Sequence, residues 1–61
     1  MTTICVLIED TIANYKTINK IIEIFPCYYN YKRVFGCLLE ITIRCREEDA
    51  KAIEDILADV V

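Results

Sequence analysis

The chain has 61 residues, 56% of them apolar, and its formal net charge is −3. This length allows one domain at most, and the apolar content excludes a disordered segment. Because the sequence contains no histidine and no serine, a Ser–His or Cys–His catalytic pair and a histidine-containing zinc site are excluded within one chain.

Residues 1–61 are expected to form a single domain in the cytoplasm, outside membranes. Glu23 and Pro26 break the longest mainly apolar run, which falls short of the roughly 20 residues that cross a bilayer. The N-terminus also lacks the basic region and apolar stretch of a secretory signal. Residues 11–46 hold six basic and two acidic side chains, whereas residues 47–61 hold one basic and six acidic. This asymmetry favours head-to-tail stacking or a charged partner, or it marks two solvated faces.

Two elements are predicted in the first half of the chain. Residues 2–9 alternate as a strand, with one apolar face and a second face that is only half polar. A helix follows, because apolar side chains recur at helical spacing from residue 12 to residue 25. Asp10 is expected to cap the N-terminus of this helix, and Pro26 is expected to end it.

The second half predicts a hairpin and a second helix. Residues 27–33 favour a strand through their tyrosines, and residues 37–45 alternate cleanly between apolar and polar. Gly36, the only glycine, is expected to take a left-handed position in a turn between these strands. Residues 47–60 predict a helix whose first turn holds three acidic side chains, at the positive end of the helix dipole.

This order predicts an α+β fold of the βαββα type. Two strands joined by a helix run parallel, either as neighbours through a right-handed crossover or with another strand inserted between them. The hairpin supplies that inserted strand, and both helices then cover one face of a three-stranded sheet. The order is similar to the ferredoxin-like fold without its fourth strand.

More narrowly, the chain resembles small ACT-like regulatory domains. The resemblance lies in the strand that ends at residues 6–10, the apolar stripe of the first helix, the turn near residues 32–36 and the helix over residues 47–60. It implies association through the sheet and binding of a small effector at the turn after the first strand. Helix capping is the alternative role for that turn. The candidate effector contacts are Glu9, Asp10, Thr11 and Asn14.

An interaction surface is predicted on the sheet and the hairpin. Without a fourth strand, residues 2–9 are left as an exposed apolar edge, which is prone to pairing. The sheet face away from the helices is also incompletely polar, as at interfaces. We therefore expect a homo-oligomer and an unidentified protein partner, against the alternative of a monomer whose terminal residues fold over the edge. The candidate interface residues are Cys5, Leu7, Tyr29, Tyr31, Lys32, Arg33, Phe35 and Leu38.

The four cysteines predict neither a metal site nor a cofactor. No two of them are separated by two residues, and Cys37 and Cys45 lie at opposite ends of one predicted strand. Cys27 and Cys45 lie at the open end of the hairpin, where a disulfide can form if their side chains share a face. The alternative is a pair of buried free thiols. A contact between two copies of Cys5 across a dimer is a further hypothesis.

The expected function is a small, non-catalytic interaction or regulatory module that associates with itself. A compact chain with few enzymatic residues fits a virus-encoded modulator of a host protein. The alternative is a module for single-stranded nucleic acid, in which the hairpin tyrosines stack on bases beside Lys32 and Arg33. Replacing Tyr29 and Tyr31 by alanine separates the two, because only a nucleic-acid module would then lose nucleic-acid binding while staying folded.

Overall fold

The structure, a computed structural model, describes residues 1–60 and confirms a small α+β protein with the βαββα order. Three strands and two helices follow one another along the chain. Their bounds are β1 Thr2–Glu9, α1 Ile12–Ile24, β2 Cys27–Phe35, β3 Leu38–Cys45 and α2 Glu47–Leu57. Within residues 1–60, neither helix combines the length and the apolar character needed to cross a bilayer.

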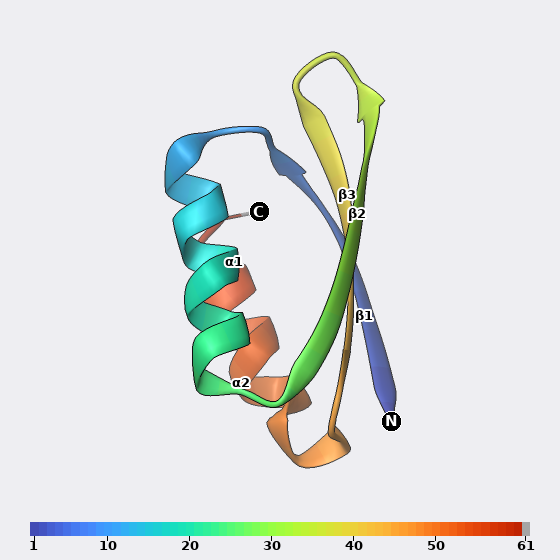
Figure 1. The fold of residues 1–61 in the computed structure, drawn as a ribbon, viewed down its shortest axis with the longest axis vertical. Helices are drawn as coiled ribbons and strands as arrows, with labels where there is room; N and C mark the ends of the chain where they lie inside the picture. The colour runs from blue at the N-terminus through green and yellow to red at the C-terminus, as the bar shows by residue number, and fades with distance from the viewer. Residues whose placement is uncertain (61) are drawn as a thin grey trace.

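The three strands form one sheet in the order β1-β3-β2. β3 pairs antiparallel with β1 on one side and with β2 on the other, so β1 and β2 run parallel to each other. The predicted insertion of a hairpin strand between them is thus confirmed. Both helices lie on the same side of the sheet (Figure 1). Within residues 1–60, β1 and β2 are therefore both edge strands.

The core lies between the helices and the sheet, and isoleucine dominates it. Every second residue of β1 and β3 points toward the helices, because side chains alternate along a strand. The helices meet these strands with the residues that recur at helical spacing. The buried core residues are Ile4, Ile8, Ile18, Ile21, Leu39, Ile41, Ile43, Cys45, Ile53 and Leu57.

The start of α1 differs from the prediction. Thr11, not Asp10, is the N-cap, and its hydroxyl accepts a hydrogen bond from the Asn14 backbone N–H at 3.2 Å. Ile12 is 76% exposed, although its spacing placed it on the apolar stripe. The end agrees, because α1 stops at Ile24 before Pro26, which disfavours helical geometry at the residue before it.

The hairpin turn is shorter than predicted. β2 continues to Phe35 and β3 begins at Leu38, so that Cys37 lies exposed in the turn and not in the strand. Gly36 has a φ of 43°, which confirms its left-handed position. A register shift between Arg33 and Phe35 places Phe35 opposite Leu38.

Candidate interaction surfaces

The sheet face turned away from both helices, called here the helix-free face, holds an exposed apolar patch near the hairpin turn. Leu7 of β1 is 51% exposed and Phe35 of β2 is 77% exposed. The half-buried Leu38 of β3 pairs with Phe35 on one side and with Glu9 on the other. Leu7 pairs with Glu40 and is therefore the diagonal neighbour of Leu38 on the same face. Residues paired across a ladder share a face, so these side chains lie on one surface. We define the apolar patch as Leu7, Phe35 and Leu38.

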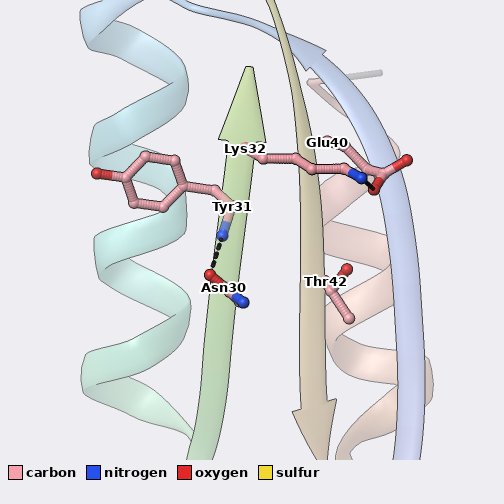
Figure 2. Close-up of a pocket in the computed structure, with 5 residues that line it drawn as sticks. All are labelled: Asn30, Tyr31, Lys32, Glu40 and Thr42. Carbon is pink, nitrogen blue, oxygen red and sulfur yellow. Dashed lines mark hydrogen bonds and ion pairs between the residues drawn. The ribbon is translucent and has the colours of Figure 1, made fainter. Parts of the chain in front are cut away.

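Polar and basic groups continue the helix-free face beyond the apolar patch. The Lys32 ammonium lies 3.6 Å from the Glu40 carboxylate, and Lys32 reaches across β3 to make this contact (Figure 2). Further from the turn, the Thr42 hydroxyl contacts the exposed Cys5 sulfur at 3.9 Å. The surface thus combines an apolar end with a polar remainder, which is the composition of many protein interfaces.

The tyrosines of β2 are divided between the two faces of the sheet. Tyr28 is paired with Arg44 and is 72% exposed on the helix-free face. Tyr29 and Tyr31 are on the helix side, and Figure 2 shows Tyr31 pointing toward α1 and away from Lys32. Their rings stack with centroids 6.2 Å apart, and Tyr31 also meets Tyr15 of α1 edge-on at 6.5 Å. The rings expected to stack on bases therefore lie on different surfaces.

The predicted interface residues consequently form two groups. Those on the helix-free face are Cys5, Leu7, Lys32, Phe35 and Leu38. The side chains of Tyr29, Tyr31 and Arg33 instead occupy the helix side of β2. The register supplies the reason, because the second group pairs with the core positions of β3.

Asp10 joins the turn after β1 to the hairpin. Its carboxylate forms an ion pair with the Arg33 guanidinium at 2.7 Å, and its backbone N–H donates to the Cys37 carbonyl at 2.6 Å. Arg33 also donates to the Gly36 carbonyl at 3.1 Å. These contacts explain why Asp10 does not cap α1: its side chain is engaged with β2.

The other candidate effector contacts also have partners within the chain. Asn14 donates from its side-chain amide to the Glu9 carbonyl at 2.9 Å, and Thr11 caps α1. Glu9, Thr11 and Asn14 border a hollow that Leu7, Leu38 and Val60 also line. The predicted effector turn is thus brought together at one place, while Asp10 turns toward Arg33.

Tyr15 is expected to titrate later than an ordinary tyrosine. The pKa of Tyr15 is raised above 10.0. The main cause is a hydrogen bond to Asp10, and desolvation and the negative charge of Asp10 make smaller contributions in the same direction. Because the folded chain holds this proton more tightly, the resulting stabilisation is complete below pH 10.0 and is lost as pH rises through the folded-state pKa. The measurement is a tyrosinate absorbance titration of the parent and of Tyr15→Phe. The tyrosine that is lost in Tyr15→Phe should be one that titrates above the ordinary pKa. If the lost tyrosine titrates at or below the ordinary pKa, the expectation is contradicted.

The cysteines are four free thiols in different settings. Cys5 and Cys37 are exposed, whereas Cys45 is buried. Cys27 lies directly opposite Cys45, on the same face, as a disulfide between them would require, and both are free thiols in the structure. Burial raises the pKa of the Cys27 thiol, and nearby Cys45 and Asp49 add to that rise. Within residues 1–60, no three acidic, cysteine or histidine side chains gather as a metal site.

A groove runs along the outer edge of β1 beneath α2. Ile4, Cys5 and Val6 form one wall, and Glu54, Leu57 and Ala58 form the other. It has a volume of about 340 Å³. Of these residues, Leu57 belongs to the apolar spacing of the predicted second helix, whereas Glu54 and Ala58 were not singled out in the sequence. Leu57 and Ala58 follow Glu54 by three and four residues, and this spacing is the signal that the three side chains share one side of the helix.

Comparison with known proteins identifies no relative. No protein-family model, no curated protein and no solved structure matches the chain.

Proposed function

We propose that this chain is a small, non-catalytic protein-interaction or regulatory module that associates with itself through the helix-free face. The observation that carries this proposal is the apolar patch, in which Leu7 is 51% exposed and Phe35 is 77% exposed. Contiguous exposed apolar side chains commonly mark protein interfaces. A chain of 61 residues also buries only about 60% of the surface of its unfolded form, so association adds burial that the domain needs.

The ferredoxin-like architecture is part of this proposal. The strand order β1-β3-β2 and the two helices on one face support it. Such a sheet, with one face uncovered, offers a surface on which two copies can pack back to back.

The test is the solution mass by light scattering behind a sizing column, with and without reductant. We expect a dimer or a larger species in both runs, because the interface is apolar and not a disulfide. Leu7→Lys and Phe35→Ser should each shift the mass toward the monomer, since they place a charge or a hydroxyl in the apolar patch.

Ile24→Lys is the matched control, because Ile24 is 61% exposed but lies on α1. It should leave the mass unchanged. A parent chain that is monomeric across the accessible concentration range would refute the proposal. So would an oligomer that survives both substitutions in the apolar patch.

A further inference from the structure

By general packing distances, two helices side by side need more width than three strands supply. Packed helices lie about 8–10 Å apart and neighbouring strands about 4.8 Å apart. Two helices side by side therefore need roughly 16–20 Å, whereas three strands supply about 14 Å. α1 contacts β2 and α2 contacts β1, so each helix lies over an edge strand. The difference is roughly 2–6 Å, which is comparable to the spacing of one strand.

The missing width coincides with the groove beneath α2. Ile4 and Leu57 line it and are 7% and 2% exposed, so the apolar walls continue directly from the core. Within residues 1–60, β1 pairs only with β3. The Glu9 carbonyl accepts hydrogen bonds from Asn14 and Thr11, so the outer backbone N–H and C=O groups left for pairing are those of the preceding part of β1. The groove therefore offers backbone pairing on one wall and apolar contact on the other.

A second copy of this chain does not suit the same place. Pairing of two β1 strands would set four helices, needing roughly 32–40 Å, over six strands that supply about 29 Å. It would also bring together two copies of α2, which holds five acidic side chains and one lysine. Like charges at such a contact oppose association. A lone strand brings no helix with it and avoids both costs.

The charge beside the groove defines the partner further. Glu54 lines the groove, and within residues 1–60 the ion pairs of α2 join Arg46 to Glu48 and Asp49 but leave Glu54 without one. A basic side chain on the incoming strand would meet this carboxylate. An acidic side chain would be repelled.

We propose that the outer edge of β1 binds an extended segment of another protein, with apolar residues at alternate positions and lysine or arginine among them. The segment adds a fourth strand beside β1, which is eight residues long. Its apolar side chains enter the groove between Val6 and Leu57, and its basic residues face Glu54. This site is distinct from the helix-free face proposed for self-association.

The probe is a fluorescent eight-residue peptide of alternating valine and threonine in which lysine replaces one central valine, because Glu54 lies opposite the middle of β1. Its binding is followed by fluorescence anisotropy, and the site is mapped by backbone amide shifts of the ¹⁵N-labelled chain. We expect saturable binding, with the largest shifts in β1 and in the second half of α2. A version with glutamate in place of that lysine should bind about fivefold more weakly.

Backbone pairing is tested by two N-methylated versions of the peptide. A strand pairs through the N–H groups on one of its edges only. Methylation of one alternating set should therefore abolish binding, while methylation of the other set leaves it. Equal loss or equal retention would overturn the proposed strand addition.

The charge is tested by Glu54→Lys, with Glu23→Lys on the exposed face of α1 as the matched control. Glu54→Lys should reverse the preference between the lysine and glutamate peptides, and the control should not. No binding, shifts confined to β2, or an unaltered preference would each overturn the inference. Phe35→Ser separates it from the proposed function, because peptide binding should persist in this variant even where the oligomer is lost.

Discussion

Replacing Ile43 by alanine is expected to lower the free energy of unfolding by about 2–5 kcal/mol. Ile43 is fully buried on the central strand, where it pairs with Ile4 of β1 and Tyr29 of β2. Truncation of Ile43 removes apolar contacts and leaves a cavity, because the surrounding side chains are held by their own strands and helices and cannot fill the space. A chain of this size has a total stability of about 3–9 kcal/mol, so the loss is a large fraction of it.

The measurement is urea unfolding followed by circular dichroism at one fixed protein concentration, because self-association makes the midpoint concentration-dependent. Ile24→Ala is the matched control. It removes the same atoms from a side chain that is 61% exposed, so the change should stay within about 0.5 kcal/mol. Equal effects of the two substitutions would show that Ile43 is not in the core.

Replacing Asp10 by alanine is expected to destabilise the fold by about 1 kcal/mol through loss of the contact with Arg33. The ion pair is short, at 2.7 Å, and the Asp10 side chain is 17% exposed, but Arg33 is 60% exposed and solvent screens it. The expected loss of stability is therefore at the upper end of the range for exposed ion pairs. Arg33→Ala should cost a similar amount.

A double-mutant cycle separates this contact from helix capping. Asp10→Ala and Arg33→Ala should be non-additive, because either change already breaks the pair. Thr11→Ala removes the cap of α1 and should cost about 1 kcal/mol. It should add to Arg33→Ala. Additivity of Asp10→Ala with Arg33→Ala would mean that Asp10 acts through α1 and not through the hairpin.

The elements and the core could be predicted because they depend on local periodicity. The alternation in β1 and β3 and the helical spacing in α1 and α2 each bury one face, whatever the partner strand or helix is. Pro26 and Gly36 act on their own backbone, so the helix end and the turn position also followed from the sequence.

The composition of each surface could be predicted only in part. Cys5, Leu7 and Leu38 share the helix-free face, as alternation required. Tyr29 and Tyr31 were grouped with them as aromatic residues, although their register places them beside α1. A list of residue types carries no information on the face, which depends on the strand pairing.

By itself, then, the sequence determined the order of the elements, the buried isoleucines and the absence of histidine or serine chemistry. Tertiary structure decided which polar and apolar groups meet. The register shift after Arg33 moves Phe35 to the face of Leu38. Pairing of β1 and β2 on either side of β3 brings Arg33 to Asp10, so that Asp10 forms an ion pair and does not cap α1. Packing of α2 over β1 creates the groove at Glu54. Each of these depends on contacts between distant segments, which local periodicity does not encode.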